Sequence, residues 1–500
     1  MQHQLDAAFG TSSDVEYFDV IIVGAGISGI GCAWQLNRDC PDKSYVVLEA
    51  QETFGGTWHT HRYPGVRSDS DLYTFGYSFR PWTESPIATG ARIRAYLTAV
   101  VEENDLERRI RYRHRILTAD WDSGRKRWSL TARREDTGEL KRFETAFLWM
   151  CQGYYRHEQG YTPQWPGMES FKGRIVHPQK WPDDLDYAGK QVLVIGSGAT
   201  AATLIPAMAD KAAHITMLQR SPTFFNPGTN ADALADQLRE LEIDEHWIHA
   251  IIRKKLLGEQ AERLRRAKEE PQAVAQEMIG AVRANLGPGV DIEKHFTPHY
   301  RPWQQRVAFI PDGDFFEPFR KGKASIVTDA IECFTPNGVL LKSGEELRAD
   351  IIVTATGFSL CVLGDVKFTI DEVPLNLADT VTYHGMMFTG VPNLVWIFGY
   401  FRSSWTLRVE LVAEFVCRML NHMSASGKQM VTMRLREEDK AEPQLPWIDE
   451  ENFNPGYLAR DMHLMPKRLN KPEWQHTQDF FSERESIPAI RFDDPAFLFS

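Results

Sequence analysis

Two glycine-rich loops, each placed between an apolar strand and an apolar helix, constrain the fold of this chain more than any other feature of its sequence. The first lies within EYFDVIIVGAGISGIGCAWQL, where a strand at 20–23 runs into Gly24-x-Gly26-x-x-Gly29. Its glycines allow a tight turn, close approach of the backbone to a pyrophosphate, and close packing of helix on strand. The start of the helix offers free N–H groups to the diphosphate. We therefore expect Gly24, Gly26, Ser28 and Gly29 to bind a dinucleotide.

An acidic residue stands where such a site contacts the ribose. The strand SYVVLEA follows the helix and ends in Glu49, 25 residues after Gly24. A carboxylate at this place accepts hydrogen bonds from a ribose diol. Strand, loop, helix, strand and acid in this order indicate a Rossmann-like unit far more specifically than the glycines alone.

The same pattern returns in KQVLVIGSGATAATLIPAM, where a strand at 192–195 precedes Gly196-x-Gly198-x-x-Ala201. Two such loops in one chain predict an α/β fold with two Rossmann-like dinucleotide-binding domains. We expect the whole second loop to bind its dinucleotide, through Gly196, Ser197, Gly198, Ala199, Thr200 and Ala201.

The two sites differ in charge where the ribose would lie. The strand HITMLQRSP ends in Arg220 and Ser221, and Arg220 comes 24 residues after Gly196. An acid would repel the 2′-phosphate of NADP, whereas an arginine can bind it. A charge-assisted hydrogen bond of about 1.5–3 kcal/mol gives NADP roughly a ten- to hundredfold advantage over NAD. We expect Arg220 and Ser221 to bind NADP; the alternative is a surface arginine at the end of a strand.

Charge and cysteine spacing exclude several other classes of protein. A formal net charge of −11 argues against a nucleic-acid binder, which needs a basic face. No CxxC pair occurs, so a disulfide scaffold, a structural zinc site and a dithiol redox centre are unsupported, and we expect no metal. The cysteines are scattered along the chain, at Cys32, Cys40, Cys151, Cys333, Cys361 and Cys417.

The sequence predicts a cytoplasmic protein. The stretch MQHQLDAAFGTSSDVEYFDV lacks the basic region and apolar run of a signal peptide. No apolar stretch approaches the roughly 18–20 residues that a membrane span needs. The run ERLRRAKEE at 262–270 indicates a solvated helix face, with peripheral contact to a membrane as the alternative. Nothing in the sequence indicates the oligomeric state.

The segment FKGRIVHPQKWP at 171–182 fits neither a strand period nor a helix period. It matches FxGxxxHxxxWP, and in this it resembles the fingerprint of the Baeyer–Villiger monooxygenases, a group within the class B flavoprotein monooxygenases. The segment GGTWHTHRYPGVRSD at 55–69 resembles a second pattern of that family. Through RYPGVRSDSDLYTFGYSFRPW, HPQKWPDDLDY, VIGSGATA and MLQRSPT the chain is most similar to the ethionamide-activating branch. The resemblance extends to about residue 425.

The resemblance implies an FAD-containing enzyme that uses NADPH and O2. Its chemistry would pass through a C4a-peroxyflavin, which converts ketones to esters or lactones and oxygenates sulfides. The alternative is a class B flavin monooxygenase that oxygenates sulfur or nitrogen and has little activity on ketones. Small-molecule ketones or sulfides are the partners expected in either case, together with O2.

Domain boundaries follow from the motifs and from a change in composition. The strands FLWMCQGYY and IIVTATGF are expected to carry the chain between an FAD-binding and an NADP-binding domain. We place the FAD-binding domain at 1–160 and 373–500, and the NADP-binding domain at 161–229 and 289–372. Residues 230–288, rich in Ala, Leu, Glu and Arg at helical spacing, are predicted to form a helical insert.

The resemblance implies a catalytic arginine in HFTPHYRPWQQRVAFIPDGDFF, which we match to Arg306. A guanidinium suits this role because it cannot lose its proton. Arg301 is the competing position, but the following Pro302 favours an extended, rim-like backbone. Many ketone monooxygenases carry a lysine just before this arginine, where this chain has Gln305. That departure leaves Arg220 as the main contact for the 2′-phosphate.

Two other sets of residues take roles from the resemblance. Asp69 is expected beside the catalytic arginine and near FAD, where it would orient the guanidinium; the alternative is a helix N-cap, a role that Ser68 and Asp71 could share. Thr57 and Trp58 are expected to face the flavin. The fingerprint residues are expected to couple the two domains, with a glycine for bending, a histidine that changes hydrogen-bond partner, and an aromatic anchor: Phe171, Gly173, His177 and Trp181. For His177 an ordinary interdomain loop histidine is the alternative.

Overall fold

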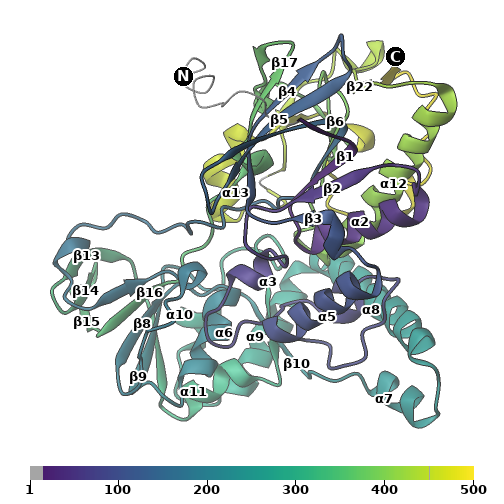
Figure 1. The fold of residues 1–500 in the computed structure, drawn as a ribbon. Helices are drawn as coiled ribbons and strands as arrows, with labels where there is room; N and C mark the ends of the chain where they lie inside the picture. Colours follow the sequence, from purple (N-terminus) through teal and green to yellow (C-terminus); the bar gives the residue numbers. More distant parts are fainter. Residues whose placement is uncertain (1–14, 450) are drawn as a thin grey trace.

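A computed structural model describes residues 15–449 and 451–500 of the chain. These residues form two lobes, each built around its own sheet (Figure 1). Residues 1–14, which carry most of the stretch used to predict the absence of a signal peptide, lie outside the described residues, as does residue 450.

The sheet of the first lobe contains the strand that leads into the first glycine-rich loop. Its strands run in the order β18-β17-β4-β5-β6-β1-β2-β3, and β21 also pairs with β6. Neighbours among β3, β2, β1, β6 and β21 are parallel, whereas β4, β5 and β6 form antiparallel pairs. The strands are β1 (Glu16–Val23), β2 (Tyr45–Leu48), β3 (Ile110–Arg111), β4 (His114–Asp122), β5 (Arg127–Arg134), β6 (Leu140–Met150), β17 (Lys367–Ile370), β18 (Val373–Pro374) and β21 (Leu394–Trp396).

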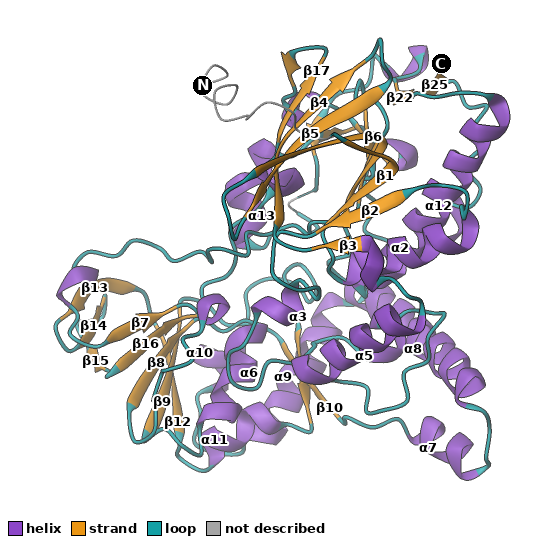
Figure 2. Cartoon of the chain, in the orientation of Figure 1, coloured by secondary structure: helices purple, strands orange, loops and turns teal. Residues whose placement is uncertain are grey.

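Burial explains why β1 reads as a continuous apolar run. It lies between β2 and β6, and Val20, Ile21 and Ile22 are all fully buried. Interior strands of parallel sheets are covered on both faces and so do not alternate apolar with polar residues. Beside this sheet the helices α2 (Ile27–Asp39) and α12 (Trp405–Ser426) lie next to each other (Figure 2).

The second lobe contains a wholly parallel sheet in the order β12-β9-β8-β16-β7. The second glycine-rich loop joins β8 to α6, so the predicted strand–loop–helix unit is present here as well. A small antiparallel sheet, β13-β14-β15, lies at the edge of the lobe (Figure 1). The elements are β7 (Arg174–Val176), β8 (Gln191–Ile195), α6 (Ala199–Met208), β9 (His214–Gln219), β10 (Phe225–Gly228), α10 (Ile292–Phe296), β11 (Ala308–Pro311), α11 (Glu317–Arg320), β12 (Ala324–Thr328), β13 (Ile331–Thr335), β14 (Gly338–Leu341), β15 (Glu346–Arg348) and β16 (Ile351–Thr354).

The segment predicted as a helical insert contains α7 (Ala233–Glu240), α8 (Glu245–Glu269) and α9 (Pro271–Leu286). Its internal proline begins α9, the position at which a missing N–H costs no helical hydrogen bond. From α8, Arg253 donates hydrogen bonds to the backbone carbonyl oxygens of Tyr73 and Gly76. The insert therefore packs against the first lobe as well as the second.

The chain returns to the first lobe earlier than the predicted boundary at residue 372. Lys367–Ile370 forms β17, which pairs in parallel with β4 of the first sheet. The chain therefore crosses between the lobes after β16, which belongs to the second sheet, and before β17, which belongs to the first. The assignment of the two lobes to FAD and to NADP stays a prediction at this point.

The segment after α12 wraps back over the first lobe. Glu483 of this segment forms an ion pair with Arg408 of α12, and both side chains are fully buried. The remaining elements of the chain are α3 (Thr57–Thr60), α4 (Leu72–Phe75), α5 (Gly90–Glu103), β19 (Thr382–Tyr383), β20 (Met387–Phe388), β22 (Val431–Met433), β23 (Leu445–Pro446), α13 (Gly456–Asp461), β24 (Lys467–Arg468), α14 (Phe480–Ser486) and β25 (Phe497–Phe499). None of the helices formed by residues 15–449 and 451–500 has the length and apolar character needed to span a membrane.

Candidate active site

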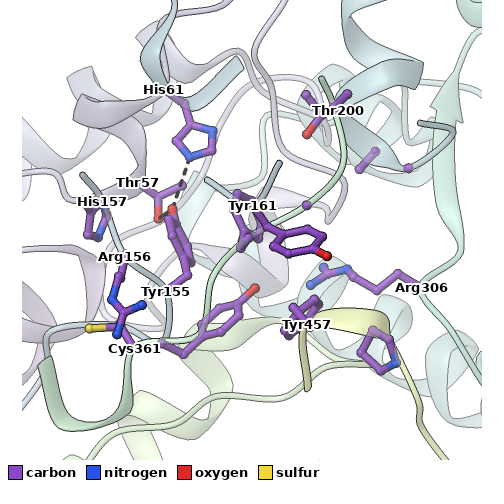
Figure 3. A pocket seen from close by; sticks show the side chains of 18 of the residues that line it. Thr57, His61, Tyr155, Arg156, His157, Tyr161, Thr200, Arg306, Cys361 and Tyr457 are labelled. Carbon is purple, nitrogen blue, oxygen red and sulfur yellow. Dashed lines mark hydrogen bonds between the residues drawn. The ribbon is translucent and has the colours of Figure 1, made fainter. Parts of the chain in front are cut away.

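A cavity of about 1010 Å³ lies where the two lobes meet, and both glycine-rich loops line it. Its wall also contains Arg306, which precedes β11, and Tyr457 of α13. Figure 3 shows these two side chains on one side of the pocket, with Thr57, His61 and Tyr155 on the other. The fold thus brings the two predicted dinucleotide sites and the predicted catalytic arginine to a single cavity.

The first loop is shaped by glycines that no other residue could replace without strain. Gly24 has a φ of +99°, and a Cβ there would lie 2.8 Å from the carbonyl oxygen of Cys151. A Cβ at Gly29 would lie 1.8 Å from the carbonyl oxygen of Gly24, which is far inside contact distance. The loop can therefore turn tightly and allow α2 to begin against it, as the sequence predicted.

Glu49 at the end of β2 is tied to this loop. Its side chain is buried, its Oε2 accepts a hydrogen bond of 2.6 Å from the N–H of Ala25, and its Oε1 accepts one of 2.8 Å from the N–H of Gln51. Burial raises the pKa of Glu49, and the two N–H groups partly offset this effect. The residue lines the cavity beside the loop, where the ribose of a bound dinucleotide was predicted.

The second loop has the corresponding arrangement with the opposite charge beside it. The five residues from Gly196 to Thr200 line the cavity, whereas Ala201 is buried. The exposed Arg220 and its neighbour Ser221 line the same cavity. Within the described part of the chain, no carboxylate forms an ion pair with Arg220. A free cation thus stands next to the loop, at the place predicted to bind a 2′-phosphate.

Arg306 and Asp69 come from different lobes and form an ion pair. Nη2 of Arg306 donates a hydrogen bond of 3.1 Å to Oδ2 of Asp69. The negative charge of Asp69 holds the pKa of Arg306 above its usual range, and the phenols of Tyr154 and Tyr457 act in the same direction. Arg306 therefore stays cationic at any working pH, and its guanidinium points into the pocket (Figure 3).

The structure does not favour the two alternatives, which were Arg301 as the catalytic arginine and a helix N-cap as the role of Asp69. Arg301 donates to the backbone oxygens of Glu451 and Asn452 and is not among the residues that line the cavity. The N-cap of α4 is Asp71, which accepts a hydrogen bond of 2.8 Å from the N–H of Thr74. Asp69 is thereby left available to pair with the arginine.

Polar residues opposite Arg306 form a second connected group. The hydroxyl groups of Thr57 and Tyr155 are 2.6 Å apart, and that of Tyr155 is 3.3 Å from Nε2 of His61. Burial lowers the pKa of His61 to about 3 and that of His157 to about 4, so both rings are neutral near pH 7. Trp58 also lines the cavity and packs edge-on against Phe75.

The residues of the fingerprint segment are not among those that line the cavity. His177 lies behind it: its Nδ1 accepts from the N–H of Gln179 at 3.2 Å, and its Nε2 is 3.2 Å from the carbonyl oxygen of Gly357. Burial lowers the pKa of His177, so the neutral ring donates from Nε2 to Gly357. Gly357 itself lines the cavity. His177 thereby connects β7 to the segment that follows β16.

The other members of the fingerprint pack within the second lobe. Phe171 contacts Phe334 edge-on, and Trp181 contacts Tyr187 in the same way. A Cβ at Gly173 would lie 2.2 Å from the carbonyl oxygen of Asp350, next to β16. The segment is therefore packed against the strand from which the chain crosses back to the first lobe.

Several cavity residues were missed by reasoning from sequence. Tyr457 lies in the segment after residue 425, for which the sequence suggested no function, and its hydroxyl is buried without a hydrogen-bond partner among the described residues. Tyr154 stands directly after the predicted strand and packs against Tyr457 and Trp405. The only available signal was the dipeptide Pro455–Gly456, which does not indicate a site. The other missed residues include His61, Tyr63, Tyr155, Arg156, His157, Tyr161, Phe358 and Arg460.

Comparison with known proteins agrees with this geometry. A family model described as "NAD(P)-binding Rossmann-like domain" matches residues 22–85, which include the first loop and Glu49. FAD-containing monooxygenase EthA of Mycolicibacterium smegmatis is 43% identical over 495 residues, covering 97% of each chain. FAD-containing monooxygenase EthA of Mycobacterium tuberculosis is 42% identical over 487 residues, covering 97% of this chain and 98% of that protein.

Solved structures share the fold at lower identity. The crystal structure of OTEMO in complex with FAD and NADP has a TM-score of 0.76 at 21% identity, covering 98% of this chain and 100% of that one. The open crystal structure of cyclohexanone monooxygenase has a TM-score of 0.76 at 19% identity, covering 97% and 100%. The predicted α/β fold with two Rossmann-like domains is confirmed. From its full-length relatives, the chain belongs to the family of FAD-containing monooxygenases.

Proposed function

We propose that this protein uses FAD, NADPH and O2 to insert one oxygen atom into ketones, giving esters or lactones, and to oxygenate sulfides. The observation that carries the proposal is the Arg306–Asp69 pair, which stands in the one cavity that both glycine-rich loops line. The relatives of the protein, which are FAD-containing monooxygenases, and the similar fold of OTEMO with bound FAD and NADP and of cyclohexanone monooxygenase support the same assignment.

The residues around the first loop fit FAD. Gly26 and Gly56 face each other so closely that a Cβ on Gly56 would lie 3.1 Å from the Cα of Gly26, leaving a backbone-lined groove. Such a groove suits a pyrophosphate, and Glu49 beside it suits the ribose diol. Thr57 and Trp58 follow the groove and line the cavity, where the flavin ring would lie against them. Bound FAD, reduced by NADPH, supplies the electrons that activate O2.

The residues around the second loop fit NADPH. Gly198 is the N-cap of α6, and a Cβ there would meet nothing within 4 Å, so the helix start is open to a diphosphate. Arg220 is the cation for the 2′-phosphate, with Ser221 beside it. On this proposal the first lobe is the FAD-binding domain and the second the NADP-binding domain, with 230–288 as an insert.

Arg306 would stabilise the negative charge that develops on oxygen during the reaction. A fixed donor aimed at such a charge typically contributes about 10²- to 10³-fold in rate. Asp69 orients the guanidinium and limits the net charge of the site. His177 would couple the lobes: it donates to the carbonyl oxygen of Gly357, which lines the cavity, so a shift of that segment would change the hydrogen bond and the cavity wall together.

A product analysis tests the proposal. The FAD-loaded protein is supplied with NADPH, O2 and a panel of linear and cyclic ketones and of sulfides. Esters or lactones are expected from some of the ketones, and sulfoxides from some of the sulfides. Consumption of NADPH with S- or N-oxides as the only products would favour the alternative, a flavin monooxygenase with little activity on ketones.

A further inference from the structure

A second cavity of about 410 Å³ adjoins the first and shares Arg306 and Asp69 with it. Its walls come from the segment around Asp71, from α8 of the helical insert, from residues 303–309 and from residues 401–404. Neither glycine-rich loop touches it. Its volume falls within the roughly 300–1,000 Å³ that is typical of small-molecule sites. Because both dinucleotide loops line the larger cavity, the second cavity is the one available to a substrate.

Most charges in the wall of this second cavity are paired with one another. Arg306 pairs with Asp69, and Lys255 pairs with Asp232 at 2.7 Å and with Glu259 at 3.7 Å. Arg263 is also 3.7 Å from Glu259. Asp71 is occupied as the N-cap of α4 and by the hydroxyl of Thr74.

Arg402 is the cationic residue in this wall that has no oppositely charged partner among the described residues. Its Nη2 donates to the backbone oxygen of Asn452, and its guanidinium carbon lies 5.6 Å from the ring centre of Phe453. Its Nε is buried without a hydrogen-bond partner, and no carboxylate of the described residues forms an ion pair with it. Burial, followed by the charge of Arg301, lowers the pKa of Arg402 to about 10, so the group is still a cation near pH 7. A partly buried cation with unsatisfied donors favours an anionic ligand.

The wall of the second cavity also contains a group of apolar side chains beside its charged and polar ones, and this group bears on the part of the ligand that lies away from Arg402. The side chains that contribute apolar surface are Leu256, Leu264, Trp303, Phe309, Phe401 and Phe453. One unpaired guanidinium matches one carboxylate, whose two oxygens accept two parallel hydrogen bonds from it. Apolar walls around that contact suit a hydrocarbon body.

We propose that the second cavity binds the substrate and that Arg402 binds a carboxylate on it, so that the preferred substrates are keto acids or sulfide acids with a hydrocarbon body. This inference rests on the proposed function and narrows its substrate class. The reacting carbonyl or sulfur would reach Arg306 at the wall that the two cavities share, while the carboxylate stays at Arg402.

Matched pairs of substrates test the inference. Methyl ketones that end in a carboxylate, over a series of chain lengths, are compared with their methyl esters as substrates of the FAD-loaded protein. At the chain lengths that fit, the acid is expected to have a KM about 10- to 100-fold lower than its ester, the gain of one charge-assisted contact. Arg402→Gln is expected to bring the ratio of acid to ester close to one, and Arg402→Lys to restore part of it.

Arg301→Gln is the matched control, because it removes a neighbouring cation that lies outside both cavities. The preference for the acid is expected to survive in that variant. Equal kcat/KM for acid and ester at every chain length, or a preference that survives Arg402→Gln, would overturn the inference. Thermal unfolding and flavin content of each variant distinguish a lost contact from a lost fold.

Equilibrium binding separates this inference from the proposed function. Calorimetric titration of the FAD-loaded protein with a keto acid and with its ester needs no turnover. Tighter binding of the acid that depends on Arg402 would support the inference even if no ketone were oxygenated, a result that would count against the proposed function alone. Equal binding of acid and ester would overturn the inference even in an active enzyme.

Discussion

Arg306 and Asp69 are 237 positions apart in the sequence, and a hydrogen bond of 3.1 Å joins Nη2 of the first to Oδ2 of the second. Asp69 follows α3 in the first lobe, whereas Arg306 precedes β11 in the second. The bond therefore crosses the junction of the lobes, and the position of the cation in the cavity depends on how the lobes sit together.

Arg306→Ala is expected to bind FAD but to form oxygenated product about 10²- to 10³-fold more slowly, because the fixed cation beside the developing oxyanion is gone. The measurement is ester formed per NADPH consumed, with hydrogen peroxide as the expected by-product. Arg301→Ala, which removes a nearby cation that lies outside the cavity, serves as the control. Full ester formation by Arg306→Ala would exclude this residue from the chemistry.

Arg220→Ala is expected to raise KM for NADPH about 10- to 100-fold and to change KM for NADH little, because only NADPH carries the 2′-phosphate. Steady-state kinetics with both nucleotides provide the comparison. Equal changes for the two would mean that Arg220 does not contact the phosphate.

Gly29→Ala is expected to yield a protein that binds little or no FAD. Its Cβ would fall 1.8 Å from the carbonyl oxygen of Gly24, so the first loop would have to open. Gly258→Ala in α8 is the matched control, since a Cβ there meets nothing within 4 Å and an alanine favours the helix by about 1 kcal/mol. The measurement is the flavin absorbance per mole of purified protein, compared between the two variants. A Gly29→Ala protein with full flavin absorbance would contradict the assignment of this loop to FAD.

His476 is expected to make the protein less stable in acid. Burial, followed by the charge of Arg408, lowers its pKa from 6.5 to about 3. Between these values the unfolded chain binds the proton and the folded chain does not, so stability falls as the pH falls below about 6.5. This group contributes a slope of up to about 1.4 kcal/mol per pH unit.

The test is the pH dependence of urea unfolding between about pH 6.5 and 4.5, above the range in which the neighbouring Glu483 titrates. His476→Asn is expected to reduce the slope by the share of this one group, whatever its effect on stability at pH 7, while the other buried histidines such as His61 and His157 keep theirs. His246→Gln, a change at an exposed position, is expected to leave the slope as it is. An unaltered slope in His476→Asn would show that this ring is not buried in its neutral form.

Local patterns were sufficient to predict the parts of the site that depend on short segments. The loops at 24–29 and 196–201, Glu49 and Arg220 follow strands at fixed offsets, so the chain itself determines their placement. Arg306 and Asp69 required the family resemblance, because no local rule pairs residues from different lobes. The return to the first lobe at β17 was placed too late, since its pairing with β4 depends on a register formed across more than 240 residues.

Tyr457 and Arg402 could not be predicted for a different reason. Both reach a cavity only because the segment after β21 wraps over the first lobe, and the buried pair Arg408–Glu483 helps to hold that segment in place. Nothing in the local sequence of a short helix such as α13 distinguishes a cavity wall from an exposed turn. Such positions follow from tertiary packing alone.

The central claim is that this chain transfers one atom of O2 to a carbonyl substrate with electrons from NADPH. Its most direct test is a single turnover under ¹⁸O₂: the FAD-loaded protein is reduced with NADPH without oxygen, then mixed with labelled oxygen and a ketone. The account predicts that the flavin absorbance bleaches and returns, and that each ester formed carries one labelled oxygen. Bleaching and return with hydrogen peroxide as the sole oxygen product, across the ketone panel, would contradict it.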